Sequence, residues 1–376
     1  MLCSASIPYG NYRFFDSSLC WHNNHHVNGF FDSLVRRTRK DMSNFSTKKP
    51  LVFLLGAGFN RDAACEAGQF VPLPSGRPAQ YPLASDLLDI CFGLDALPPD
   101  RSVEDLFQNS INIGDRKPLE ALYEVLMEAD YYISPHLKHG GSHEDNVYIG
   151  FLRDFPREPL LTFNYDSLPE ILLLAERSWC PLDGYGVKVQ AHEKTIRRGE
   201  QPVEISLRSI LHLHGSLCVY PATFYLEKRS GIEPDMLKFD RPPDFIFDPD
   251  ALGHCFFPFE RIPPSVTYTH VADRVIAPVP NKAEGLKGEF IEAVYSQAVK
   301  FLSTARQIIS IGYSFNPHDR HSYTKLLAAA VEKPVLLVAP DAESVIARLT
   351  DEYPDIRWAA QSMSFKEWVN NGYPGV

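Results

Sequence analysis

Two glycines follow a short apolar run in the sequence LLGAGFN. Gly56, Ala57 and Gly58 would form a tight turn after a buried strand, and glycine lets a backbone approach a phosphate closely. The alternative is a purely structural turn from strand to loop. Arg61 stands where the dinucleotide-binding fingerprint of dehydrogenases has its third glycine, so that fingerprint does not fit.

An amide and a carboxylate follow a second apolar run, in TFNYD. Asn164 and Asp166 would lie at the carboxyl end of a strand, which is where open parallel sheets bind ligands. Asparagine and aspartate also cap helices, and a helix over 168–176 is predicted directly after them. Both interpretations stay open from this segment alone.

Two histidines end a third run, in HLHGS. His212 and His214 are two residues apart and would share one face of a regular strand. They could form a metal-binding pair, which would need a further histidine or carboxylate such as Asp319 or His321. Alternatively, His214 acts alone as a base, or is a satisfied structural residue.

Two later runs end in groups that could hold a sugar or a phosphate. In IGYS, Gly312 and Ser314 offer a backbone N–H and a hydroxyl at a strand end. In VAPD, Asp341 could accept hydrogen bonds from sugar hydroxyls.

The elements that must position these groups are short strands alternating with helices. The runs are apolar throughout, which is typical of strands buried on both faces of a parallel sheet. Predicted strands cover 51–58, 160–166, 209–216, 274–279, 307–314 and 334–341. Besides 168–176, predicted helices cover 83–91, 118–130, 289–305 and 322–332. This alternation predicts an α/β, doubly wound, mainly parallel Rossmann-like sheet.

Composition shifts divide the chain further. Residues 1–48 lack periodicity and are expected to form a loose N-terminal arm, or to precede a true start at Met42. One domain is expected over 49–345, followed by a strand/helix extension of the same domain over 346–376. A helical insertion is expected at about 83–150, and a loop-rich, Pro- and aromatic-rich insertion at about 218–272.

The overall composition is that of a globular protein. Of 376 residues, 44% are hydrophobic and 22% charged, and the net charge is −10. This balance argues against a fibrous chain and against direct nucleic-acid binding. Seven cysteines without close pairs form no visible disulfide framework. No apolar run approaches membrane-span length. We expect a soluble, cytoplasmic protein that binds no membrane.

The ordered series GAG, NYD, HG and GYS resembles the sirtuin family, in particular its bacterial NAD-hydrolysing branch of antiphage-defence proteins. The resemblance covers roughly 50–345. It implies catalytic roles for Asn164 and His214, and Asn60 takes the place of the usual serine. The residues that it implies for NAD binding are Gly56, Ala57, Gly58, Asn60, Asp166, Gly312, Ser314 and Asp341.

The chain also departs from sirtuin deacylases. Their zinc ribbon has two C-x2-C pairs, whereas the corresponding interval holds only Cys218 and Cys255, with His254 and His270 as further ligand types. We therefore expect no metal. The separation of Asn164 from His214 is also longer than in typical deacylases.

Without a ribbon to frame a peptide, water is the expected nucleophile and NAD the substrate. The predicted function is therefore an NAD glycohydrolase that acts in antiviral defence. The alternatives are an NAD or ADP-ribose sensor without turnover, an NAD-dependent protein deacylase, and a metal-dependent hydrolase. The resemblance also implies a homo-oligomer and a partner protein of a defence system.

Overall fold

Short apolar runs form the strands of one open sheet of six strands. In spatial order the strands are β4 (Ile210–His212), β2 (Leu160–Thr162), β1 (Leu51–Leu55), β7 (Gln307–Ile311), β8 (Pro334–Val338) and β9 (Arg357–Gln361). Every neighbouring pair is parallel. Every residue of β1 is buried, as expected for a central strand covered on both faces. The predicted doubly wound α/β fold is thus confirmed.

The computed structural model describes part of the chain. The described residues are 50–61, 63, 81–98, 101–122, 124–126, 129, 146–176, 178–181, 183–187, 189–191, 206–216, 219–221, 245–247, 278–280, 282 and 289–376. They all belong to one unit, Lys49–Val376. The predicted arm at 1–48 and most of the predicted strand at 274–279 lie outside the described residues.

The order of the strands reverses at the centre of the sheet. Counted along the chain within this sheet, the strands lie in the order third, second, first, fourth, fifth, sixth. Dinucleotide-binding Rossmann folds share this order, and open α/β sheets bind ligands at the carboxyl ends of the strands where it reverses. Here the reversal falls between β1 and β7, whose carboxyl ends carry Gly56 and Gly312.

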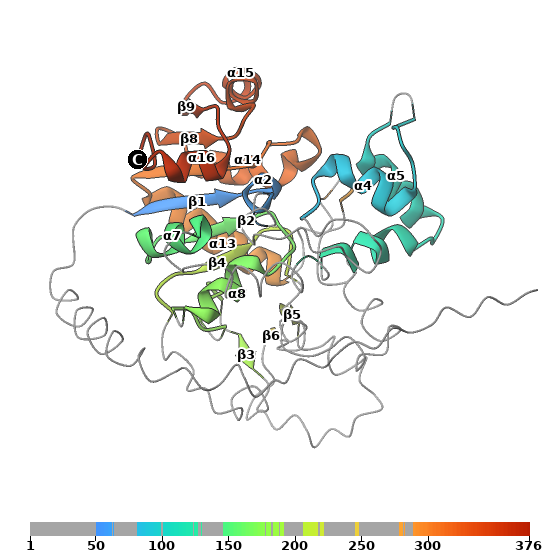
Figure 1. Cartoon of the computed structure of the whole chain (residues 1–376), viewed down its shortest axis with the longest axis horizontal. Helices are drawn as coiled ribbons and strands as arrows, with labels where there is room; N and C mark the ends of the chain where they lie inside the picture. The colour runs from blue at the N-terminus through green and yellow to red at the C-terminus, as the bar shows by residue number, and fades with distance from the viewer. Residues whose placement is uncertain are drawn as a thin grey trace, which may run out of the picture. The chain divides into compact units, whose positions relative to one another are not determined.

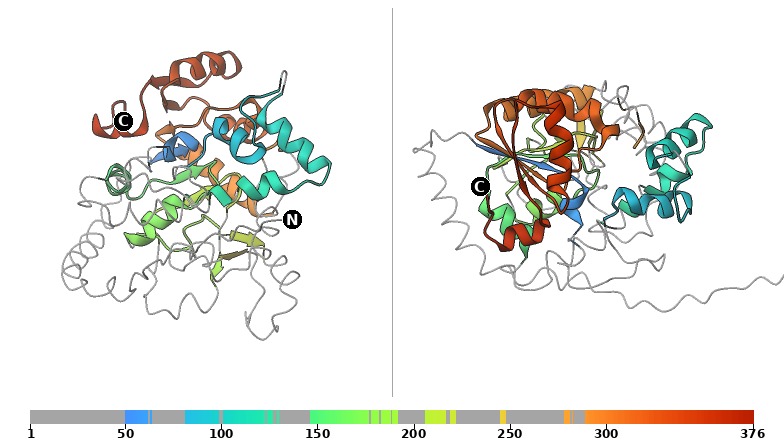
Figure 2. Two further views of the ribbon diagram at one scale, coloured as in Figure 1. Left: turned by 45° about the vertical axis from the view of Figure 1, so that its right-hand side comes forward. Right: turned by 90° about the horizontal axis from the view of Figure 1, so that it is seen from above.

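Helices cover both faces of the sheet (Figures 1 and 2). The longer helices are α4 (Ala84–Phe92), α5 (Val103–Asn112), α7 (Val147–Asp154), α8 (Leu168–Ala175), α13 (Glu289–Thr304), α14 (Arg320–Ala329), α15 (Ala342–Glu352) and α16 (Phe365–Asn370). Seen from above, α7, α8 and α16 lie on one side of the sheet, and α13 and α14 lie on the other (Figure 2).

Aromatic rings fill the core between β1 and the helices α7 and α16. Phe53 of β1 meets Phe151 of α7 edge to face, with ring centroids 4.9 Å apart. Phe365 of α16 lies 5.3 Å from Phe151 and 4.6 Å from Phe59, which follows β1. Fully burying a side chain of this size contributes about 1.5–3 kcal/mol, so this cluster fixes the helices that support the first turn of the site.

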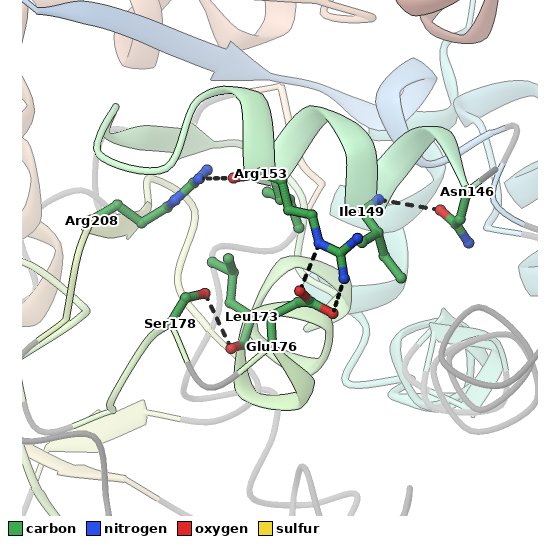
Figure 3. Close-up of polar contacts among 8 residues, drawn as sticks. Asn146, Ile149, Arg153, Leu173, Glu176, Ser178 and Arg208 are labelled. Atoms are coloured by element: carbon green, nitrogen blue, oxygen red, sulfur yellow. Dashed lines mark hydrogen bonds and ion pairs between the residues drawn. The ribbon is translucent and has the colours of Figure 1, made fainter. Parts of the chain in front are cut away.

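Polar contacts join α7 to its surroundings (Figure 3). Arg153 of α7 forms a two-pronged ion pair with Glu176, which follows α8, at 2.9 and 3.2 Å. Arg208, just before β4, is buried and donates to the carbonyl of Leu152 in the last turn of α7. A cation at a helix C-terminus is favoured by the helix dipole.

The predicted helical insertion contains α4 and α5. Ser102 caps α5 by accepting from Asp105 N–H at 3.1 Å, and the Asp105 carboxylate accepts from Ser102 N–H at 2.9 Å. Phe92 of α4 packs edge to face on Phe107 of α5. The boundary predicted near residue 150 falls inside α7, which packs on the sheet.

Three shorter strands make a second sheet: β3 (Gln190–Ala191), β6 (Phe245–Phe247) and β5 (Val219–Pro221). Thus the interval 218–272 contributes two strands, and its other residues lie outside the described ones. Among the residues described, no helix has the length and apolar character to cross a membrane.

Candidate functional site

Two glycine-containing turns pack against each other where the strand order reverses. Gly56 N–H donates to Ile311 O at 3.0 Å, and Gly58 N–H donates to Gly312 O at 2.9 Å. A Cβ added at Gly56 would lie 2.5 Å from Tyr313 Cα. Gly312 has φ of +60°, and a Cβ there would lie 2.3 Å from Phe59 N. Glycine is therefore required here because two backbones touch.

This packing uses most of the N–H groups that could hold a phosphate. Gly56 and Gly58 donate as above, and Phe59 N–H donates to Gly56 O at 2.9 Å. Ala57 is exposed at the start of the four-residue helix α2 (Ala57–Asn60), and its N–H has no partner among the described residues. The predicted phosphate contact of this turn stays a prediction, and Ala57 is the backbone donor left for it.

Asn164 lies against the first of these turns. It follows β2, is 9% exposed, and its Nδ2 donates to Gly56 O at 3.1 Å. Its own N–H donates to Thr162 Oγ1 at 3.0 Å. Two motifs that are 108 residues apart in the chain therefore meet, and the amide predicted as catalytic lies beside the central glycine turn.

Asp166 links the same turn to α8. Its carboxylate accepts from Asn60 Nδ2 at 2.6 Å and from Leu168 N–H at 3.1 Å. Asp166 thus accepts the N–H of the first residue of α8, although the N-cap residue of that helix is Ser167, and its carboxylate also anchors Asn60. The Oδ1 atom of Asn60 is buried and accepts no hydrogen bond within the part of the chain that the structure describes.

His214 follows β4, the neighbour of β2. Its ring meets Phe163 edge to face, with centroids 4.8 Å apart, and lies 6.1 Å from the ring of Tyr165. Its Nε2 lies 3.0 Å from Ser322 Oγ of α14. The imidazole therefore contacts the residues on either side of Asn164, while the Asn164 amide itself is bonded to Gly56.

Burial dominates the protonation of His214. The side chain is 2% exposed. Its desolvation and the positive charge of Lys282 lower the pKa of His214 to about 3, against a smaller opposing effect of Asp319. The buried imidazole is therefore neutral at physiological pH.

A buried ion pair faces this histidine. Lys282 pairs with Asp319 of η5 (Pro317–Asp319), and Tyr313 OH donates to the same carboxylate at 3.3 Å. Burial by itself would raise the pKa of Asp319, but the charge of Lys282 and its ion pair with Asp319 hold that pKa below its ordinary value. Burial raises the pKa of Tyr313 well above 10. The Tyr313 ring stacks on Phe163 at 4.0 Å.

Sequence reasoning missed Lys282 and Ser322 as neighbours of His214. Lys282 lies in a polar stretch, and Ser322 lies on a helix with no distinctive pattern. Asp319 was considered as a metal ligand, but its described partners are a lysine and a tyrosine. In the sequence, Asp319 and Ser322 lie shortly after IGYS at 311–314, and this closeness to a strand end is the one local feature that could have indicated them.

His212 and His214 do not form the metal pair considered from the sequence. The two ring nitrogens of His212 face Glu170 Oε1 at 2.5 Å and Asn164 O at 3.1 Å. Within the described ranges, no three His, Cys, Asp or Glu side chains are grouped to hold a metal. The other scattered ligand types, Cys218, Cys255, His254 and His270, lie outside the described residues.

Two other residues predicted to bind NAD, Ser314 and Asp341, also follow strands of the large sheet. Ser314 is exposed after β7, and its carbonyl accepts from Arg348 at 2.6 Å. Asp341 is exposed after β8 and is the N-cap residue of α15. Phe315 has a φ of +49°, a left-handed conformation that is uncommon outside glycine. No hydrogen bond joins Ser314 or Asp341 to Asn164 or His214, all four of which are described residues.

The helical insertion is tied to both central turns. Arg61, at the end of α2, forms an ion pair with Asp86 of α4 at 2.6 Å. Asn316 Nδ2, in the loop after β7, donates to Glu104 of α5 at 2.8 Å. These partly exposed contacts attach α4 and α5 beside the edge that carries Asn164.

One solved structure is similar to this chain, at low sequence identity. No family model matches the chain, and no curated protein matches it. A solved structure of Sir2, in complex with the inhibitor EX-527, 2'-O-acetyl-ADP-ribose and a deacetylated p53 peptide, is similar at 13% identity. The match covers 89% of this chain and 96% of that chain, with a TM-score of 0.32. The strand order described above identifies the fold.

Proposed function

We propose that this protein is an NAD glycohydrolase that cleaves NAD to nicotinamide and ADP-ribose. One observation carries the proposal. Asn164 and His214 follow neighbouring parallel strands, and Asn164 is bonded to the turn where the strand order reverses. Open sheets of this order bind dinucleotides at that point. The residues proposed to contact NAD are those that the sequence predicts, with Ala57 as the backbone donor for phosphate.

The reaction needs no general acid to protonate the leaving group. Nicotinamide leaves as a neutral ring from a cationic pyridinium, so the site has to hold the ribose and present water to C1′. The Asn164 carboxamide would orient a ribose hydroxyl or the water. Neutral His214 would accept its proton. Because Nε2 faces Ser322, Nδ1 is the ring nitrogen left for that transfer.

Both side chains are nearly buried, so substrate has to displace what covers them. The contacts Arg61–Asp86 and Glu104–Asn316 are the described links between the insertion helices and the central turns. Exposed or partly exposed pairs of this kind contribute about 1 kcal/mol or less each. Separating the insertion helices from these turns would therefore cost little free energy at these two links.

The direct test is release of nicotinamide from NAD by the purified chain. We expect His214→Ala and Asn164→Ala to lower the rate by about 10²–10⁴-fold. His321→Ala is the matched control, because His321 is an exposed histidine on α14. Equal rates in the wild type and all three variants would refute the catalytic assignment. Calorimetric binding of NAD without turnover would instead favour the sensor.

The same assay separates the deacylase alternative. With an acyl-lysine peptide present, a deacylase would release the acyl group only when NAD is supplied, and nicotinamide release would depend on the peptide. A glycohydrolase releases nicotinamide with water alone. We therefore expect the rate to be independent of the peptide.

We further propose that the activity serves antiviral defence through depletion of NAD, in a homo-oligomer or with a partner protein. The support is the resemblance of the ordered motifs. NAD should fall after phage challenge in cells that express the wild type, and not in cells that express His214→Ala. An equal NAD level in both strains after challenge would contradict this role.

A further inference from the structure

A second histidine, unused by the proposed chemistry, lies under Asn164. His212 and Glu170 are both fully buried, at 0% exposure, and their side chains face each other at 2.5 Å. The other ring nitrogen of His212 faces the backbone carbonyl of Asn164 at 3.1 Å. The pair thus connects α8 and β4 to the main chain of the residue proposed as catalytic.

The partners of this histidine define its protonation. A carbonyl oxygen can only accept, and an ionised carboxylate can only accept, whereas a neutral imidazole carries one N–H. Two acceptors therefore call for an imidazolium. Desolvation by itself would lower the pKa of His212, but Glu170 raises it above the ordinary value, and the Asn164 carbonyl and Asp166 act in the same direction.

Stability does not account for this pair. Two buried charges lose their hydration, and well-packed apolar residues in their place are often as stabilising or more so. Glu170 Oε2 is moreover buried without a hydrogen bond in the described part of the chain. An arrangement of this kind is better explained by what it positions.

What it positions is the peptide group of Asn164. That residue is held at three points: its N–H by Thr162 Oγ1, its carboxamide by Gly56 O, and its carbonyl by His212. The carbonyl lies after a strand that has already ended at Thr162, so no ladder hydrogen bond of β2 fixes it. The His212 hydrogen bond therefore acts directly on the plane of the peptide that follows Asn164.

We propose that His212 and Glu170 form a positioning pair that fixes the backbone of Asn164 and thereby aims its carboxamide at the substrate. The kinetic part of this proposal rests on the proposed function. Small misplacements of a reacting group can cost about 10²-fold in rate, so loss of the bond should lower kcat while NAD binding is kept.

Two substitutions separate positioning from mere folding. In His212→Asn, combined with Glu170→Gln, the side-chain amide lies where Nδ1 was and can still donate to Asn164 O. In His212→Gln, also combined with Glu170→Gln, the amide reaches the former Nε2 position and leaves that carbonyl without its donor. Both variants remove the same two charges, and they differ in which of the two hydrogen bonds of His212 the new amide can keep, the one to Asn164 O or the one to residue 170.

We expect the Asn variant to keep kcat for nicotinamide release within about 3-fold of the wild type, and the Gln variant to lose about 10–100-fold, with NAD affinity similar in all three. Thermal unfolding of each variant gives its folded fraction, to which kcat is normalised. Equal losses of kcat in the two variants would overturn the positioning role.

A spectroscopic measurement tests the pair without any turnover. In the full chain labelled with ¹⁵N-histidine, the resonance lost in His212→Asn should show two N–H protons at neutral pH, and Glu170→Gln should reduce them to one. A single N–H in the wild type would overturn the pair. A wild type that shows both protons but hydrolyses no NAD would refute the proposed function and leave the buried pair established.

Discussion

Substitution of Gly312 by alanine tests how the two central turns meet. The residue has φ of +60°, and an added Cβ would lie 2.3 Å from Phe59 N and 2.4 Å from Gly58 C, both backbone atoms. The left-handed conformation costs about 1–2 kcal/mol for a residue with a Cβ. Relieving the overlap requires a backbone shift, which costs about 1–3 kcal/mol. We therefore expect Gly312→Ala to lose about 2–5 kcal/mol of unfolding free energy.

Gly114→Ala is the matched control. Gly114 also has a positive φ, +74°, but an added Cβ there has nothing within 4 Å. It should cost about 1–2 kcal/mol, the conformational part alone. Urea unfolding of both variants, followed by far-ultraviolet circular dichroism, measures the difference. If Gly312→Ala is no less stable than Gly114→Ala, the two turns do not touch as described, and glycine at 312 then has another cause.

Two further predictions concern the charges around His214. Because the pKa of His214 is about 3 when folded, below its ordinary 6.5, its contribution to stability is complete above pH 6.5 and falls as the pH drops toward 3. The slope reaches about 1.4 kcal/mol per pH unit. In urea unfolding between pH 7 and pH 4, His214→Asn should remove this slope, and an unchanged slope would mean that the folded imidazole is protonated. Lys282→Met should cost about 3–5 kcal/mol because it leaves Asp319 buried without its cation, whereas Lys282→Met with Asp319→Leu should recover most of that loss. Thermal unfolding compares them, and equal loss in both variants would argue that the pair carries no charge.

Much of the fold is predictable because its signals are local. The runs that form β1, β2, β4, β7 and β8 are short and mostly apolar, and a glycine, asparagine, histidine or, after β8, aspartate follows within three residues, so each strand and its carboxyl end can be predicted locally. β9 has a weaker signal, since its residues are half-exposed at the edge of the sheet. The predicted helices 83–91, 168–176 and 289–305 correspond to α4, α8 and α13 for the same local reason.

Gly56 and Gly58 are an example of a sequence pattern that has two possible structural explanations. In the sequence, Gly56 and Gly58 indicate a phosphate-binding turn, since close approach of a backbone needs a residue without Cβ. In the structure the approaching group is another stretch of this chain, at Gly312. Both causes demand the same residue, so the residue type could not distinguish them.

The amino-acid sequence by itself determined the class of the sheet, the strand ends that carry Asn164 and His214, and the types of chemistry open to them, because apolar runs and their terminating residues act within one element. Tertiary structure alone decided the partners: Ser322 for His214, Glu170 for His212 and Asp319 for Lys282, over separations of 108, 42 and 37 residues. The order of the strands and the crossing of helices over the sheet bring these groups together. The spacing of these residues along the chain does not predict their pairing, because the free energy of each contact depends on burial and geometry that arise only when the elements pack.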